Sequence, residues 1–238
     1  MPTVLVGGVL LEASRRNLVA EDFRLAFWPA SRALLSGSFR YPASVASAFG
    51  QGDPYVYPPL TAALLSPFAL LSSSAASWLF TAAGGAAVLA GLWILEVRDW
   101  RCFGAVFAWP PVLAALQAGN LSLLLVLCLA LTWRARQQPI RQGVLTAVAI
   151  SAKLFLWPLL LWLIVTRRYR ATVWSLITVA GLNAIVWVIA SAGNPWRYAQ
   201  LIHGVSQAQR PESYTLWALV VQTGLPGVVG TSIVALAF

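Results

Sequence analysis

The side chains in this sequence that could do chemistry begin with two neighbouring carboxylates, Glu21 and Asp22. They open residues 21–60, the one long stretch too polar to cross a bilayer in an otherwise strongly apolar chain. A carboxylate at the mouth of a cavity can act as a general base and take a proton from an incoming hydroxyl group. An aspartate at the start of a helix can instead accept hydrogen bonds from free backbone N–H groups. Both roles are open to Asp22, and Glu21 is its rival as the base.

A single ammonium group is the second candidate. Lys153 is the only lysine in the chain, and it lies within an apolar segment with Pro158 soon after it. A charged side chain at membrane depth is costly, so it often marks a functional site or a charged partner. A lysine can also avoid that cost by extending its amine to the membrane surface.

The composition indicates a polytopic integral membrane protein. Apolar residues make up 59% of the chain and charged residues only 10%, with twelve tryptophans, whereas roughly a quarter of the residues of a soluble domain are charged. The net charge of +9 comes from short arginine clusters between apolar runs rather than from one basic face. Nucleic acid is therefore excluded as the expected partner.

Metal and nucleotide sites are not indicated. Cys102 and Cys128 both lie in apolar segments, which favours small core residues over a disulfide or metal site. The chain has no Asp-x-Asp pair and no phosphate-binding glycine loop. Gly84, Gly85 and Gly91 lie in an apolar segment, where we expect them to allow close helix packing. We expect neither a metal nor a cofactor.

Five apolar segments must position these groups. Pro110 and Pro111, and then Gly119 and Asn120, interrupt residues 102–133, so we expect two short helices there rather than one. The five segments are residues 75–97, 102–118, 121–133, 142–166 and 171–192.

Arginine clusters between these segments predict the topology, because cytoplasmic loops of membrane proteins carry an excess of positive charge. All the clusters can be cytoplasmic only if residues 142–166 turn back as two half-length helices that meet near Lys153, toward the outer leaflet. Residues 21–60, Asn120, Lys153 and residues 193–223 then face the opposite side. The clusters are Arg98/Arg101, Arg134/Arg136/Arg141 and Arg167/Arg168/Arg170.

We expect a single membrane domain over residues 1–238. It comprises an extracytoplasmic loop (12–60), transmembrane helices (61–192), a second extracytoplasmic loop (193–223) and the start of a further transmembrane helix (224–238). Residues 1–11 are apolar but shorter than the roughly 20 residues needed to cross a bilayer. They resemble the end of a helix whose beginning is missing, and the C-terminal segment likewise stops partway through a span.

Two parts of the first loop have ordinary structural interpretations. Helical spacing of its apolar residues predicts a helix lying in the membrane interface, bent at Pro29 and ended at Gly37. An interfacial tyrosine followed by prolines, as at Tyr57 and Pro58, is a common start for a membrane helix. The apolar face comprises Phe23, Phe27, Ala30 and Leu34, whereas Arg24, Ser31 and Arg32 face elsewhere.

Taken in order, these motifs resemble those of bacterial glycosyltransferase family 87. The resemblance covers most of residues 20–195, although family members are usually longer and have more membrane helices. The motifs that carry it are Asp22-Phe23, residues 30–37, Tyr41, Tyr57-Pro58-Pro59-Leu60, Pro67, Gly119-Asn120, and Lys153 with Pro158.

The resemblance implies an all-α polytopic bundle of the GT-C superfold, with short and broken transmembrane helices and a long extracytoplasmic first loop. It implies transfer of a hexose, mannose, from a polyprenyl-phosphate donor, with inversion, at the outer face of the bacterial plasma membrane. The partners would be that donor, a glycolipid or polysaccharide acceptor of the cell envelope, and the lipid bilayer.

The resemblance also implies roles for single residues. Asp22 matches the family's acidic residue in the first outer loop and would be the catalytic base, and Lys153 would stabilise the departing phosphate. Asn120 could bind sugar hydroxyls or simply end a helix. His203 could contact phosphate or be an incidental loop residue. The predicted substrate-binding residues are Glu21, Tyr57, Pro58, Asn120, Lys153 and His203.

Two other interpretations remain open. In a transporter or lipid flippase, Lys153 and the broken helices would line a substrate path. An inactive, truncated relative would only pack against partner membrane proteins. The long acidic and aromatic outer loop, and the absence of paired repeats in the sequence, favour the transferase.

Overall fold

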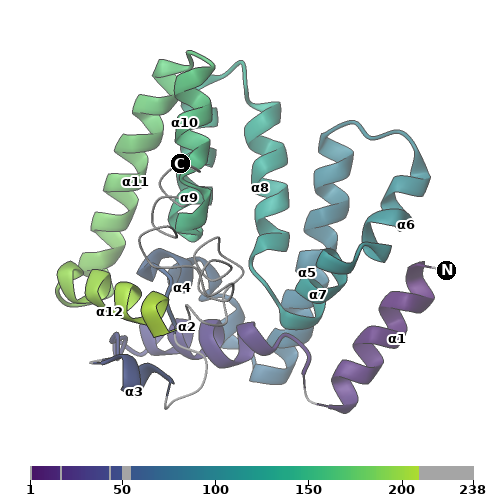
Figure 1. Cartoon of the computed structure of the whole chain (residues 1–238), viewed down its shortest axis with the longest axis horizontal. Coiled ribbons are helices and arrows are strands. Elements are labelled where there is room, and N and C mark those ends of the chain that lie inside the picture. The colour runs from purple at the N-terminus through teal and green to yellow at the C-terminus, as the bar shows by residue number, and fades with distance from the viewer. Residues whose placement is uncertain (1, 17, 43, 50–54, 209–238) are drawn as a thin grey trace, which may run out of the picture. The chain divides into compact units, whose positions relative to one another are not determined.

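The structure is a computed structural model that describes residues 2–16, 18–42, 44–49 and 55–208. Its contacts divide the chain into two compact units, Met1–Arg40 with Gly52–Ala192, and Tyr41–Gln51 with Gly193–Phe238. All regular elements of the described residues are helical (Figure 1), which confirms the expected all-α architecture. The expected helix at 224–238, and residues 209–223 of the second loop, lie outside the described residues.

Prolines begin many of these helices, since a first helical position needs no backbone N–H. The larger unit contains α1 (Pro2–Arg15), the π-helix η1 (Phe23–Phe27), α2 (Trp28–Leu35), α4 (Pro59–Leu65), η2 (Phe68–Leu70), α5 (Ser73–Ile94), α6 (Trp100–Ala108), α7 (Pro110–Ala118), α8 (Ser122–Arg134), α9 (Pro139–Ala152), η3 (Leu154–Leu156), α10 (Pro158–Val165) and α11 (Tyr169–Ile189). The smaller unit contains α3 (Val45–Phe49) and α12 (Pro195–Ala208).

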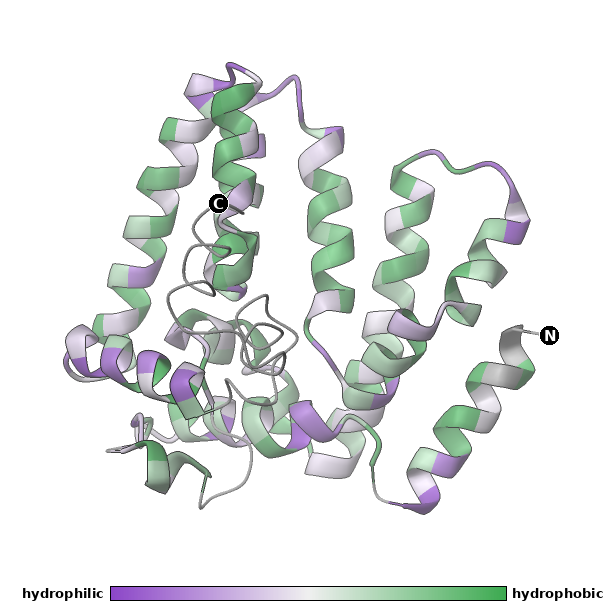
Figure 2. Cartoon of the chain, in the orientation of Figure 1, coloured by the Kyte–Doolittle hydropathy of each residue, from purple (hydrophilic) through white to green (hydrophobic). Residues whose placement is uncertain are grey.

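Two of the described helices, α5 and α11, are long and apolar enough to cross a membrane. The pair α7 and α8 passes the same test but is bent by 118°, as a broken span or a re-entrant loop would be. Figure 2 shows hydrophobic residues along these helices and hydrophilic residues at the turns that connect them. The chain is thus a membrane protein with short and broken helices.

Residues 102–133 form parts of three helices, α6, α7 and α8, rather than the expected two. Trp109 is extended and ends α6, and Pro110 and Pro111 begin α7 immediately. Gly119 then ends α7 in the left-handed conformation, with φ of 67°. Each of the two interruptions therefore ends a helix, whereas we had expected residues 102–133 to be divided only once.

The expected turn at Lys153 is confirmed. Lys153 ends α9 in an extended conformation, and α10 returns beside α9 and α11 (Figure 1). Arg168, which follows α10, donates hydrogen bonds to the carbonyl oxygen of Arg136 and to Gln142 Oε1, which flank the start of α9. Arg134 forms a 3.0 Å ion pair with Glu96. These contacts gather the arginine clusters at one end of the unit.

Close contacts hold α9 at both of its ends. Gly143 has no room for a side chain, because a Cβ there would lie 2.6 Å from Trp174 Cβ on α11. Further along, Asn183 Nδ2 donates to Ser151 Oγ at 2.8 Å, and Thr61 Oγ1 of α4 donates to the Ala152 carbonyl at 2.9 Å. The last two residues of α9 are therefore held by α11, at Ser151, and by α4, at Ala152.

Candidate active site

The helix that follows Asp22 is buried by the protein itself. Phe23 is fully buried and stacks on Phe80, with ring centroids 4.3 Å apart, and Phe27 packs 4.7 Å from Tyr57. Ser31 is also fully buried. The apolar face of this helix therefore packs against protein, and its place in the membrane interface stays a prediction. The structure does confirm an end near Gly37, which has φ of 70°.

Asp22 does not cap this helix. Its backbone is helical (φ −55°, ψ −45°) and its side chain makes no capping hydrogen bond, so the capping interpretation is wrong. The carboxylate instead accepts a long hydrogen bond of 3.5 Å from Asn120 Nδ2 to its Oδ2 atom. The structure thus brings together two predicted site residues that lie far apart in the sequence.

A tight backbone contact holds these two residues together. Ala20 N donates to the Gln117 carbonyl at 2.8 Å, and both Ala20 and Gly119 have positive φ. A Cβ on Gly119 would lie 2.5 Å from Ala20 Cβ and 2.6 Å from Ala20 Cα. Glycine is required here both for its φ and for the approach of the other chain segment. Asp22 follows Ala20 by two residues, and Asn120 follows Gly119 directly.

Asn120 connects the carboxylate to the ammonium group. Its Oδ1 atom accepts hydrogen bonds from the backbone N–H of Ser122 at 3.0 Å and from Lys153 Nζ at 3.4 Å. A backbone N–H can only donate, so it fixes this atom as the oxygen and turns Nδ2 toward Asp22. The amide therefore donates to the negative group and accepts from the positive one.

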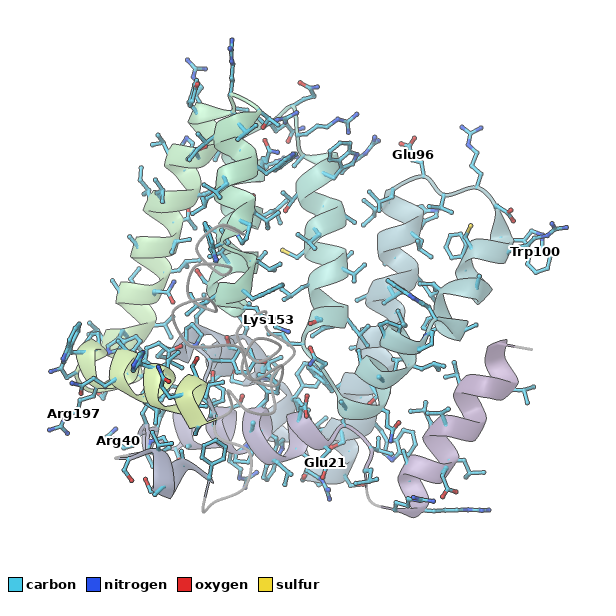
Figure 3. All side chains as sticks on the ribbon, viewed as in Figure 1. Glu21, Arg40, Glu96, Trp100, Lys153 and Arg197 are labelled. Carbon is cyan, nitrogen blue, oxygen red and sulfur yellow. The ribbon has the colours of Figure 1, made fainter. Side chains whose placement is uncertain are left out.

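Lys153 lies at the end of α9 (Figure 3), partly buried. Its shortest hydrogen bond, 2.7 Å, goes to Ser122 Oγ. Ser122 was not among the predicted site residues, because an isolated serine at the start of an apolar helix has no distinguishing feature in the sequence. Its position two residues after Asn120 is the one signal that could have indicated it.

Tyr57 lies close to the carboxylate, and Pro58 has a structural role. Burial raises the pKa of the Tyr57 hydroxyl, and the negative charge of Asp22 raises it further. The Pro58 carbonyl accepts a 2.8 Å hydrogen bond from Tyr55 O–H, and Pro59 begins α4. The ordinary interpretation, a proline-led helix start, is thus confirmed for this motif.

Glu21 and His203 are the other two predicted substrate-binding residues. Glu21 is partly buried, and its side chain has no hydrogen bond or ion pair with the described residues. His203 lies exposed on α12 in the smaller unit, where its Nε2 atom is 3.4 Å from Gln207 Nε2. A substrate contact by either residue stays a prediction.

The site contains a proton acceptor, the Asp22 carboxylate, and a cation, the Lys153 ammonium group. The side-chain amide of Asn120 is hydrogen-bonded to both. An ionised carboxylate can take a proton from a hydroxyl group, and an ammonium group can stabilise a developing phosphate charge. No group of three or more His, Cys, Asp or Glu residues in the described ranges could hold a metal ion.

Removing the Asp22 charge should lower the pKa of Tyr57. In an Asp22→Asn variant the tyrosinate no longer faces a nearby negative charge, so it forms more easily. The pKa should still exceed the ordinary tyrosine value, since burial is the larger cause of the shift. Ultraviolet titration, with the spectrum of a Tyr57→Phe protein subtracted, measures this, and Glu21→Gln is the matched control. Equal Tyr57 pKa values in Asp22→Asn and the unsubstituted protein would contradict the proximity of the two groups.

Comparison with known proteins identifies the family. The model of glycosyltransferase family 87 matches residues 55–237, a range that includes Tyr57, Asn120 and Lys153 and begins after Asp22. No curated protein matches the chain, and no solved structure does. The match covers most of the chain, and the helices are those of a membrane protein. The chain therefore belongs to glycosyltransferase family 87 and is a membrane glycosyltransferase.

Proposed function

We propose that this glycosyltransferase moves mannose from a polyprenyl-phosphate donor to a hydroxyl group of a glycolipid or polysaccharide acceptor of the cell envelope. The observation that carries the proposal is the hydrogen-bonded series Asp22, Asn120 and Lys153. The identities of the sugar and its carrier follow from the resemblance to the family.

In this reaction Asp22 acts as the base. The acceptor oxygen attacks C1 of the sugar from the face opposite the phosphate, so the configuration at C1 inverts. A bond forms between C1 and the acceptor oxygen as the bond between C1 and the phosphate oxygen breaks. The acceptor proton passes to the Asp22 carboxylate, and polyprenyl phosphate leaves with the electron pair.

Lys153 is placed to receive the phosphate. Its partners in the described structure are the neutral oxygen atoms of Asn120 and Ser122, and it forms no ion pair there. The negative charge of Asp22 acts on it as well, and in the proposed reaction an incoming phosphate shares this cation. Hydrogen bonds between an ammonium group and phosphate are short and strong, and they strengthen as negative charge develops on the leaving oxygen.

The position of the cluster supports an extracytoplasmic site. Asn120 and Ser122 lie at the start of α8 and Lys153 at the end of α9, whereas the arginine clusters lie at the opposite ends of both helices. If the arginine end is cytoplasmic, the reacting groups face the other side of the bacterial plasma membrane. A donor carried by a lipid can reach such a site by diffusing within the bilayer.

Asp22→Asn should reduce sugar transfer by about 10²- to 10⁴-fold, the usual contribution of a general base. The assay uses membranes containing the protein, radiolabelled polyprenyl-phosphate-mannose and membrane lipid acceptors. Glu96→Gln removes a carboxylate at the arginine end and should retain transfer, because Glu96 pairs with Arg134 and is not one of the predicted site residues. Unfolding temperatures in detergent show that both variants are folded. Full transfer by folded Asp22→Asn would overturn this mechanism.

Lys153→Ala should weaken donor use. Loss of a charge-assisted hydrogen bond costs about 1.5–3 kcal/mol, so we expect the KM for the donor to rise by roughly ten- to a hundredfold. The KM for the acceptor serves as the internal control and should change little. An unchanged donor KM would assign Lys153 to the alternative role, in which its amine only reaches the membrane surface.

A further inference from the structure

A polar cavity of about 300 Å³ lies between η1 and the start of α5. Arg24 lines it, together with Ser14 of α1 and three serines of α5, Ser73, Ser74 and Ser77. The described residues that line it include one cation and four hydroxyl groups but no carboxylate. This composition favours an anionic ligand. The proposed sugar transfer uses none of these residues.

A larger apolar cavity of about 790 Å³ adjoins it. Side chains and backbone of α1, α5, α6 and α7 line this space, among them Leu10, Leu89, Phe103 and Phe107. Trp78 lines both cavities, so the two are neighbours. The combined space is polar at one end and apolar at the other, as a membrane lipid is.

One face of α5 also changes from polar to apolar along the helix. Ser74, Trp78, Ala82 and Gly85 succeed one another at intervals of three or four residues, and this spacing places them on one side of a helix. The hydroxyl groups lie in the first turns, and the apolar residues lie further along. α5 is also one of the helices long enough to cross the membrane, so this gradient runs from its end toward the bilayer interior.

Thr81 gives an independent indication of a ligand. It lines the apolar cavity and is only 5% exposed, and its Oγ1 atom has no hydrogen-bond partner within the described structure. A buried hydroxyl without a partner costs free energy and requires an explanation. Threonine has two accessible χ1 rotamers in a helix, and a rotation can offer its O–H to an acceptor in the cavity.

We propose that this composite cavity binds an anionic glycerophospholipid of the bilayer. The phosphate lies against Arg24 and the serines, a glycerol ester carbonyl accepts from Thr81 near Trp78, and an acyl chain occupies the space between α1, α5, α6 and α7. The site is distinct from the reacting groups, so its existence does not depend on the proposed transfer reaction.

Lipid retention measures this binding directly. The full chain in detergent is mixed with equal amounts of dioleoyl phosphatidylglycerol and dioleoyl phosphatidylcholine, and native mass spectrometry identifies the lipids that remain bound. One phosphatidylglycerol should be retained in preference to phosphatidylcholine. Arg24→Gln should lower its retention about tenfold, the loss of one charge-assisted hydrogen bond. Arg24→Lys should restore part of it. Arg15→Gln, at an exposed arginine of α1 outside both cavities, should change nothing.

A second variant tests the apolar end. A Cβ on Gly85 would meet only Leu116 and Phe107, both at 3.9 Å, so Gly85→Leu can fold while its side chain fills the cavity. Retention of phosphatidylglycerol should fall, whereas Gly181→Leu, at a glycine of α11 with open space around it, should leave it unchanged. Equal retention of the two lipids, or equal effects of each variant and its control, would overturn the proposal.

Discussion

The candidate site depends on the close approach of two backbone segments at Gly119 and Ala20. No side chain fits at Gly119, and Ala20 itself is fully buried with φ of 50°. A left-handed non-glycine residue costs roughly 1–3 kcal/mol and persists only where its surroundings enforce it. Here the hydrogen bonds from Ala20 N to the Gln117 carbonyl and from Arg24 N to the Ala20 carbonyl provide that support. This backbone contact holds Asp22 beside Asn120. Without it, the Asp22 carboxylate would not lie next to the side-chain amide of Asn120.

A second constraint places the cation. α9 ends at Lys153 because α4 and α11 hold its last turn, through Thr61 and Asn183. Non-helical backbone at membrane depth is tolerated where protein covers it or where it lines a wet cavity. The break at Lys153 therefore serves two purposes: it turns the chain back toward the arginine end, and it directs an ammonium group to Asn120 and Ser122. Helix packing and site chemistry share the same residues.

Much of this could be predicted from the sequence, where the determining forces are local. The prolines, Gly119 and the arginine clusters predicted the break before Asn120 and the turn at Lys153. Lys153 was a candidate because it is the only lysine and lies in an apolar segment, and Asp22 because of its place in the polar loop and the resemblance to the family. The contact between Ala20 and Gly119 has no local signature, because it joins residues far apart in the chain. For the same reason Ser122 was missed. The side chain of Asp22 was open to two roles, and only the structure, in which its backbone is helical and its side chain makes no capping hydrogen bond, excludes capping.

The central claim is that Asp22, Asn120 and Lys153 form one reaction site. An experimental structure of the full chain with polyprenyl phosphate bound, obtained by cryo-electron microscopy, tests it most directly. The account predicts a phosphate oxygen about 2.7–2.9 Å from Lys153 Nζ, with the Asp22 carboxylate facing the space in front of that phosphate. A phosphate bound elsewhere, with Lys153 still hydrogen-bonded to Ser122 and Asn120, would contradict it.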